Sequence, residues 1–321
     1  MDEFEFIAKY LAPLAGPGGL GLKDDAAIFT PTIGTDLIIT KDTMVEGVHF
    51  PHGHYGGNTA GKLLRANLSD LAAKGAAPVG YMLSIVWPRG ANEGVFKDFA
   101  EGLAAIQKKY GFKLLGGDTS SSRGPMVVTA TLFGEVPEHS MVRRNGANVG
   151  DDIWVTGTIG DAYLGLQKTL GRPIDPKPKG TGLKHFENAY FRPEPRISFG
   201  KHLRDYASAC ADISDGLIAD AGHVAMVSGV GFKLHLADIP LSRPASEWVG
   251  EDLSRLKTLV TAGDDYELVF TSSPINETTL NEANTGLQLT KIGTVVAGSG
   301  VKVIWGDDQS ILFDQTGHKH F

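Results

Sequence analysis

The chain has 321 residues and a formal net charge of −7, so it offers no large basic field to a nucleic acid partner. Hydrophobic residues make up 42% of the sequence, which is enough for a real core, and the length predicts two medium-sized domains. Cys210 is the single cysteine, which excludes an internal disulfide framework and a multi-cysteine zinc site.

The amino-terminal segment 1–16 is acidic and amphipathic, without the basic start and apolar run of a signal peptide. The longest apolar stretches, such as 126–133, are far shorter than a membrane span. We therefore expect a soluble cytoplasmic protein with no membrane partner.

Hydrophobic periodicity predicts helices and strands that alternate along the whole chain. In the first half the pattern predicts a helix at 3–13, strands at 36–40 and 79–86, helices at 58–74 and 93–110, and strands from 113 to Asp118 and at 126–135. In the second half it predicts strands at 152–157, 231–236 and 266–271, and helices at 162–170, 196–209, 214–227 and 251–259. This alternation is typical of α/β or α+β layers.

A polar, glycine-containing stretch at 143–150 reads as a hinge between two domains. We place the first domain at 1–140 and the second at 141–321. A loop rich in proline, lysine and glycine is expected at 173–182, and Cys210 is expected to be an inert core thiol in a helical run.

Glycine-rich phosphate loops of the familiar kinds are absent, but aspartates collect at strand ends and loops. They are Asp24-Asp25, Asp42, Asp70, Asp118, Asp212, Asp215 and Asp264-Asp265. An isolated aspartate is usually a turn or cap residue, and Asp212 could cap the helix that follows it. Asp24-Asp25 precede Ala-Ala-Ile, which predicts a short buried strand beneath two carboxylates that repel each other unless a cation lies between them. The chemistry alone leaves both a multi-Mg²⁺ phosphate site and ordinary structural roles open.

Several motifs occur in the order found in one known family. They are Asp24–Ala27, Lys41–Phe50, Asn67–Ala76, Gly116–Thr119, Arg144–Ala147, Asp212–Leu217, Gly263–Leu268 and Gly317–Phe321. Over nearly its full length the chain resembles the thiamine-monophosphate kinases, which belong to the superfamily of aminoimidazole-ribonucleotide synthetase. The resemblance implies an ATP-dependent phosphotransferase that converts thiamine monophosphate to thiamine diphosphate by direct in-line transfer. It also implies a two-domain α/β fold and a homodimer, in which the N-terminal domains pair their sheets into a β-barrel beside the ATP site.

The resemblance also implies roles for individual residues, with no protein group acting as a covalent catalyst. Ligands of several Mg²⁺ ions would be Asp25, Thr40, Lys41, Asp42, Asp70, Asp118, Asp212 and Asp215. ATP would be bound by Gly117, Asp118, Arg144 and Ser214. Thiamine monophosphate would be bound by His49, Asp264 and Gln315, the last standing where some relatives have a tryptophan that stacks on the thiamine rings.

The sequence departs from the family pattern beside two of these ligands. Lys23 stands where the family usually has glycine, and Lys41 where it has threonine. The lysines could replace part of a cation's charge, or their side chains could extend into solvent. Two alternatives to the kinase remain: a related ATP-dependent enzyme of the superfamily, and a non-catalytic ATP-binding dimer.

Overall fold

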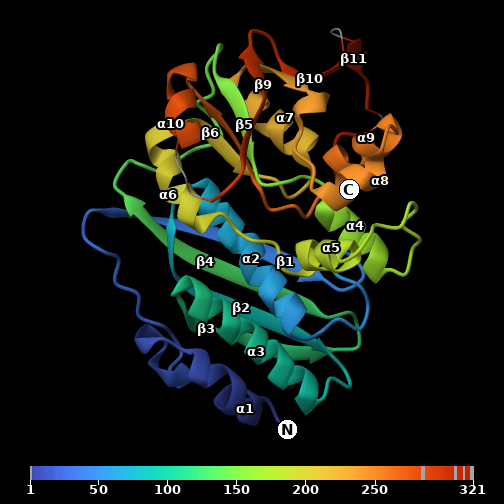
Figure 1. The fold of residues 1–321 in the computed structure, drawn as a ribbon. Coiled ribbons are helices and arrows are strands. Elements are labelled where there is room, and N and C mark those ends of the chain that lie inside the picture. The colour runs from blue at the N-terminus through green and yellow to red at the C-terminus, as the bar shows by residue number, and fades with distance from the viewer. Residues whose placement is uncertain (1, 283–285, 307–308, 314, 319–321) are drawn as a thin grey trace. The chain divides into compact units, whose positions relative to one another are not determined.

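The structure, a computed structural model, describes residues 2–282, 286–306, 309–313 and 315–318. The chain divides into two units (Figure 1). The N-terminal unit comprises Met1–Leu71 and Ala76–Ser140, and the C-terminal unit comprises Ala72–Gly75 and Met141–Phe321. Within the described residues, no helix combines the length and the hydropathy that crossing a bilayer needs.

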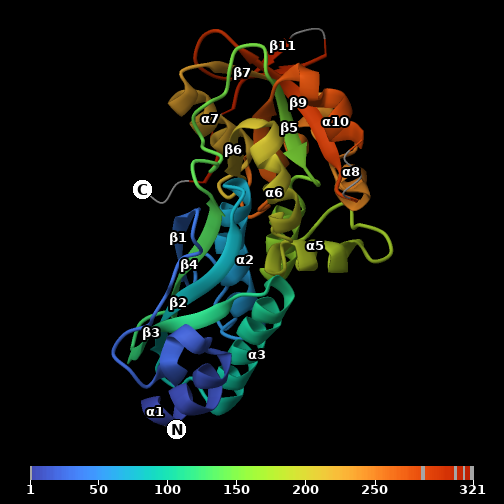
Figure 2. The same cartoon turned by 90° about the vertical axis from the view of Figure 1, so that its left-hand side faces the viewer.

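A four-stranded sheet forms the centre of the N-terminal unit. Its strands are β1 (Thr35–Val45), β4 (Val127–Pro137), β2 (Ala77–Pro88) and β3 (Lys113–Ser122), in that spatial order. β4 is antiparallel to both neighbours, and β2 is parallel to β3. Helices α2 (Gly57–Ala73) and α3 (Glu93–Tyr110) lie on one face of the sheet (Figure 2). Buried and more exposed side chains alternate along β2 and β4, as expected for a sheet with one covered face.

The other face of this sheet carries exposed side chains. Ile39 of β1 is 60% exposed, Met82 of β2 is also exposed, and Phe133 lies opposite Ile39 in the register. An apolar face of this kind on a sheet is a candidate contact surface.

The first residues form short helical segments instead of one regular helix. They are α1 (Glu3–Phe6), the π-helix η1 (Ile7–Leu11), and the 3₁₀ segments η2 (Ala12–Leu14) and η3 (Pro17–Leu22). Asp2 and Glu5 form a capping box at α1, and the Phe6 ring lies 4.9 Å from that of Phe96 on α3. The stretch predicted as a helix is therefore helical, but with changing geometry.

The short buried strand expected after Asp25 is absent from the described residues, so that prediction is wrong. Residues 24–26 form a bend and are exposed, and Ile28 is 62% exposed. A hydrogen bond of 2.8 Å from Ile28 N–H to Gly18 O ties the segment to η3, but one such bond does not make a ladder.

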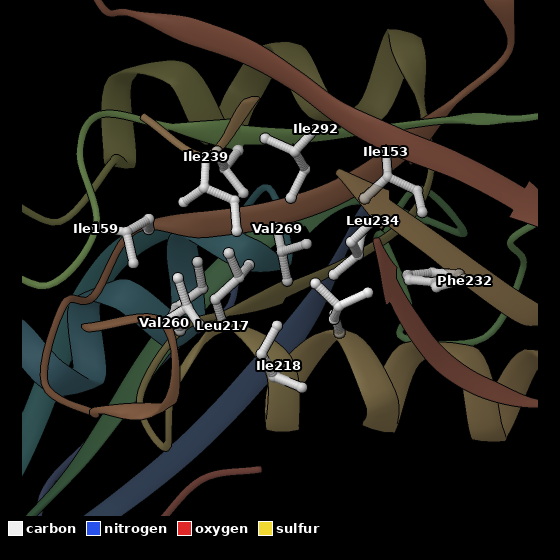
Figure 3. Packing of buried hydrophobic residues seen from close by; sticks show 14 of the residues in the cluster. Ile153, Ile159, Leu217, Ile218, Phe232, Leu234, Ile239, Val260, Val269 and Ile292 are labelled. Carbon is white, nitrogen blue, oxygen red and sulfur yellow. The ribbon is translucent and has the colours of Figure 1, made fainter. Parts of the chain in front are cut away.

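A seven-stranded sheet forms the centre of the C-terminal unit. In spatial order its strands are β11 (Gln309–Ile311), β10 (Gly300–Trp305), β7 (Gly231–His235), β9 (Leu289–Val296), β5 (Asp152–Thr156), β8 (Leu268–Ser272) and β6 (Ala207–Asp212). β10 and β7 are parallel and the other pairs are antiparallel. A buried cluster joins the sheet to α7 (Leu217–Ser228), with Val269, Leu234 and Leu217 among its members (Figure 3).

Further helices complete this unit. They are α4 (Asp161–Thr169), α5 (Gly182–Phe191), α6 (Ile197–Tyr206), η4 (Leu236–Asp238), α8 (Arg243–Val249), α9 (Leu253–Thr261), η5 (Pro274–Asn276) and α10 (Glu277–Glu282). The prediction missed α5, α8 and α10. α8 has a recognisable start, because the Ser242 hydroxyl accepts from Ala245 N–H and a proline follows in the first turn.

Two predicted helix limits in this unit are wrong. The helix expected over 196–209 ends at Tyr206, and Ala207 begins β6 because that segment pairs with β8. The helix expected from Ser214 begins at Leu217, with Gly216 as its N-cap, so Asp212 is not the cap. Cys210 therefore lies on a strand and not in a helical run.

Cys210 is expected to be unreactive in the folded protein. Its side chain is fully buried, and burial raises the pKa of the thiol to about 12. Because the thiolate is the nucleophile, Ellman's reagent should release no thiolate product from the native chain at pH 8. It should release one equivalent after unfolding in guanidinium, since the sequence has one cysteine. A rapid reaction of the native chain would contradict the buried position.

Candidate functional site

Thr40, Asp42 and Asp70 form a polar cluster between β1 and α2. Thr40 and Asp42 occupy alternate positions of β1, and the Thr40 hydroxyl donates a hydrogen bond to Asp70 Oδ2 on α2. Burial, followed by the negative charge of Asp70, raises the pKa of Asp42 to about 7. Two carboxylates in a partly buried position favour a cation between them. The sequence-predicted residues Thr40, Asp42 and Asp70 are thus brought together.

Lys41 stands between Thr40 and Asp42, so its side chain emerges on the opposite face of the sheet. It is exposed there, opposite Thr131 of β4. Lys23 is exposed as well. In the single chain both lysine side chains therefore extend into solvent, as in the second of the two alternatives. A metal contact from Lys41 would have to come from its backbone carbonyl.

A cavity of about 290 Å³ brings Asp25 together with Gly117 and Asp118. Asp24 also lines it, and Leu11, Leu22, Leu114 and Leu115 contribute apolar wall. Gly117 allows β3 to approach β2 closely, because a Cβ at this position would lie 1.7 Å from Leu83 O. The cavity therefore combines an apolar wall with carboxylates from two segments that are distant in the sequence.

His49 lies in a tight turn directly after β1. Its ring Nδ1 accepts a hydrogen bond of 3.0 Å from the Val45 backbone N–H. The backbone N–H of His49 donates a hydrogen bond of 2.9 Å to Val45 O. Because Nδ1 is the acceptor, the proton of the neutral ring is on Nε2. The backbone of its own turn thus orients the His49 ring.

Two loops of the C-terminal unit are paired, and they carry the predicted site residues Ser214, Asp215 and Asp264. Asp264 N–H donates a hydrogen bond of 2.9 Å to Ser214 O, and Tyr266 N–H donates one of 2.8 Å to Ile213 O. Ile213 N–H in turn donates 2.8 Å to Glu267 O. Asp264 has φ 74°, a left-handed conformation that a residue with a side chain rarely adopts, and the paired loops hold it there. Asp212, buried at the end of β6, leads into the same arrangement.

Asp220 of α7 organises the first of these loops, and sequence reasoning missed it. Its Oδ2 accepts the N–H groups of Ser214 and Asp215 at 3.0 Å and of Gly216 at 3.2 Å. Burial raises the pKa of Asp220 to about 7, although the backbone hydrogen bonds lower it in part. An aspartate in the first turn of a predicted helix, just after Gly216, is the signal that could have identified it. Asp220 therefore satisfies three backbone N–H groups ahead of α7.

Arg144 and Gln315 are exposed in the C-terminal unit. The carbonyl of Arg144 accepts from the Ser228 hydroxyl at 3.3 Å. Near Gln315, the N–H of His318 donates 2.9 Å to Asp215 O, and a Cβ at Gly317 would lie 2.7 Å from the same oxygen. The segment at 317–318 thus approaches the Asp215 loop closely. The last motif residues, 319–321, lie outside the described residues.

An ion pair anchors the Gly263–Glu267 segment. The Arg196 guanidinium donates two hydrogen bonds to the Glu267 carboxylate, one from Nε to Oε2 at 2.6 Å and one from Nη2 to Oε1. The Thr156 hydroxyl also donates to Oε2, at 2.6 Å. Burial raises the pKa of Glu267, while Arg196 lowers it in part. Nearby, the Asp265 carboxylate accepts from Gly160 N–H at 2.9 Å and 3.0 Å. Arg196 is a second residue that the sequence reasoning missed.

Two family models match this chain. One, the AIR synthase related protein N-terminal domain, matches residues 23–136, and the other, the C-terminal domain of the same group, matches residues 148–306. The thiamine-monophosphate kinase of Caulobacter vibrioides is 42% identical over 311 residues, which is 94% of this chain and 86% of that protein.

Solved structures of similar proteins cover almost the whole chain. The thiamine-monophosphate kinase of Stenotrophomonas maltophilia has a TM-score of 0.85 and 35% identity, over 97% of this chain and 98% of that one. AaThiL complexed with AMPPCP and TMP has a TM-score of 0.79 and 30% identity, over 99% of this chain and 97% of that one.

Proposed function

The chain belongs to the thiamine-monophosphate kinase family, and on this premise we propose that it transfers a phosphoryl group from ATP directly to thiamine monophosphate. One observation of its own structure carries the proposal: two carboxylates, Asp42 and Asp70, share a partly buried position with the Thr40 hydroxyl. The similar structure of AaThiL with AMPPCP and TMP supports the same pair of substrates.

The donor set suits Mg²⁺. Carboxylate and hydroxyl oxygens are the ligands that this ion prefers. A cation would offset the burial and the Asp70 charge that together raise the pKa of Asp42. We assign Thr40, Asp42 and Asp70 to one such site. Asp25, Asp118, Asp212 and Asp215, and the carbonyl of Lys41, are further proposed ligands. When bound, Mg²⁺ ions neutralise the phosphate charges of the two substrates and so allow them to approach.

The other residues of the chain position the substrates. Phosphoryl transfer needs accurate alignment and charge stabilisation more than covalent help from the protein. The Arg144 guanidinium and the Ser214 hydroxyl would donate to ATP phosphate oxygens, and Gly117 would let the nucleotide approach β3. His49 Nε2–H would donate to the phosphate of thiamine monophosphate. Asp264, with Gln315, would contact the remainder of that substrate.

A direct assay tests the proposed function. Purified protein, ATP, Mg²⁺ and thiamine monophosphate should yield thiamine diphosphate, detected as its fluorescent thiochrome derivative after chromatography. Thiamine in place of thiamine monophosphate should give no product, and EDTA should stop the reaction. ATP binding without thiamine diphosphate formation would instead support a non-catalytic ATP-binding dimer.

We further propose a cytoplasmic homodimer, in which the open face of the N-terminal sheet pairs with that of a second copy to form a β-barrel. Ile39 and Met82 are exposed on this face. Covering them would remove apolar surface from water, which favours association.

Ile39→Glu should therefore weaken the dimer. In a two-fold interface the substitution acts twice, and each copy exchanges an apolar side chain for a charge that loses its hydration when the interface forms. We expect the dissociation constant to rise by more than about 10²-fold, measured by sedimentation velocity across a concentration series. Ile275→Glu is the matched control, since Ile275 is 85% exposed on η5 of the other unit. Equal effects of the two substitutions, or none, would reject the proposed interface.

A further inference from the structure

The turn that carries His49 is closed by backbone hydrogen bonds. Glu46 N–H donates 2.9 Å to Met126 O, and Gly47 N–H donates 2.8 Å to Phe50 O. Gly47 has φ 80°, and a Cβ there would lie 2.9 Å from the His52 ring, so the turn favours glycine at this position. These backbone hydrogen bonds bring His49 back towards Val45.

The Glu46 side chain connects this turn to the loop that follows and to Met126, the residue before β4. Its Oε2 accepts from Met126 N–H at 2.9 Å, while Oε1 accepts from Gly53 N–H at 3.2 Å and from the Tyr55 hydroxyl at 2.8 Å. His52 Nδ1 lies 3.1 Å from Oε1, but the His52 side chain is 80% exposed. Both oxygens of a buried carboxylate are therefore occupied by donors from two separate segments.

The ionised form of Glu46 suits these contacts. Burial would raise its pKa, but hydrogen bonds from Met126, Tyr55 and Gly53 outweigh that effect and leave the pKa lowered. A carboxylate is only an acceptor, and three N–H or O–H groups point at it. An amide of the same size would turn its NH₂ group towards at least one of those donors.

We propose that Glu46 is a positioning residue for His49: it closes the segment at 46–55 so that the His49 ring stays on Val45 N–H and presents its Nε2–H to the phosphate of thiamine monophosphate. The proposal rests on the proposed function for the identity of that ligand. Because protein donors already occupy both oxygens of Glu46, the proposal gives it no contact with either substrate. Its effect on catalysis passes through His49, and this sets it apart from a residue that merely supports the fold.

A double-mutant cycle between Glu46 and His49 tests this coupling. His49→Ala should raise KM for thiamine monophosphate about tenfold, as expected for the loss of a hydrogen bond to a charged group. Glu46→Gln should raise the same KM by a similar factor and leave KM for ATP within about twofold. The double variant should match His49→Ala alone, because the ring that Glu46 positions is then gone. The proposal would be overturned if the KM increases of the two single variants multiplied in the double variant. It would also be overturned if Glu46→Gln raised KM for ATP as much as KM for thiamine monophosphate.

Matched variants keep the test interpretable. Glu138→Gln makes the same chemical change at an exposed glutamate of the N-terminal unit and should leave both KM values unchanged. If Glu46→Gln fails to fold, Tyr55→Phe removes a single donor from Glu46 and should still raise KM for thiamine monophosphate selectively.

A spectroscopic readout separates this inference from the proposed function. In ¹⁵N-histidine-labelled protein, long-range ¹H–¹⁵N spectra should show His49 with unprotonated Nδ1 and protonated Nε2, assigned by its loss in His49→Ala. Glu46→Gln should shift His49 towards averaged tautomers. A tautomer that stays fixed in Glu46→Gln would overturn the inference even if the wild type makes thiamine diphosphate. If the wild type makes no thiamine diphosphate, the proposed function is rejected. The tautomer measurement then still decides whether Glu46 positions His49.

Discussion

Asp70→Asn is expected to lower kcat for thiamine diphosphate formation by about 10²-fold or more. Asp70 accepts the Thr40 hydroxyl and faces Asp42, so it contributes a charge where we place a Mg²⁺ ion between phosphates. An amide keeps the size and the acceptor oxygen but removes that charge. The measurement is kcat at saturating ATP, Mg²⁺ and thiamine monophosphate. Asp205→Asn, an exposed aspartate on α6, should keep full activity.

The same substitution should leave metal-free stability unchanged or higher, which separates lost function from lost folding. A carboxyl whose pKa is raised on folding binds its proton more tightly in the folded state. The folded state therefore loses stability as the pH rises from the ordinary value of 3.8 to about 7, the pKa of Asp42. Removing the Asp70 charge weakens this effect, so any gain should appear above pH 7 and disappear at acid pH. Urea unfolding in EDTA at two pH values measures it, and a large loss of stability would contradict the carboxylate pair.

Arg196→Met is expected to lower the free energy of unfolding by about 3–5 kcal/mol. The substitution leaves Glu267 buried without its guanidinium partner and close to Asp161, whose charge also raises the pKa of Glu267. Because Ile213 N–H bonds the Glu267 carbonyl, the loops that carry Ser214 and Asp264 should loosen as well. Thiamine diphosphate formation should then fall even at temperatures where the variant is folded.

Arg243→Met is the control for this experiment. Arg243 pairs with Glu247 at 3.0 Å, but its side chain is 89% exposed, so its loss should cost less than about 1 kcal/mol. Denaturant unfolding followed by tryptophan fluorescence compares the two variants, since Trp154 and Trp248 both lie in the C-terminal unit. Equal midpoints for the two variants would show that the buried pair adds nothing.

Local patterns predicted the elements whose ends are encoded locally. The helix predicted at 93–110 has the same bounds as α3, because Asn92 caps its start and Gly111, with φ 78°, ends it in the left-handed conformation. β6 could not be predicted in this way. Its sequence, Ala-Ser-Ala-Cys-Ala-Asp, lacks β-branched residues, and pairing with β8 imposes the strand.

In the candidate site, too, the sequence identified some residues and could not identify others. Motifs identified Asp42 and Asp70, but only the alternation along β1 shows that Lys41 points to the other face of the sheet. Asp220 and Arg196 carry no motif of their own in the sequence reasoning. Arg196 meets Glu267, which lies 71 residues further along the chain, so its role depends on the tertiary fold, whereas Asp220 accepts from backbone N–H groups four to six residues before it.

β1 has one set of side chains facing α2 and another facing outward, at alternate positions. Ile39, Lys41 and Thr43 belong to the outward set, and Thr40 and Asp42 to the inward set. Inserting or deleting a single residue near Ile38 would exchange the two sets in the part of the strand after it. The Lys41 ammonium group would then lie beside Asp70, and the Asp42 carboxylate would lie on the outward surface. This strand should therefore tolerate substitutions on either side far better than any change in its length.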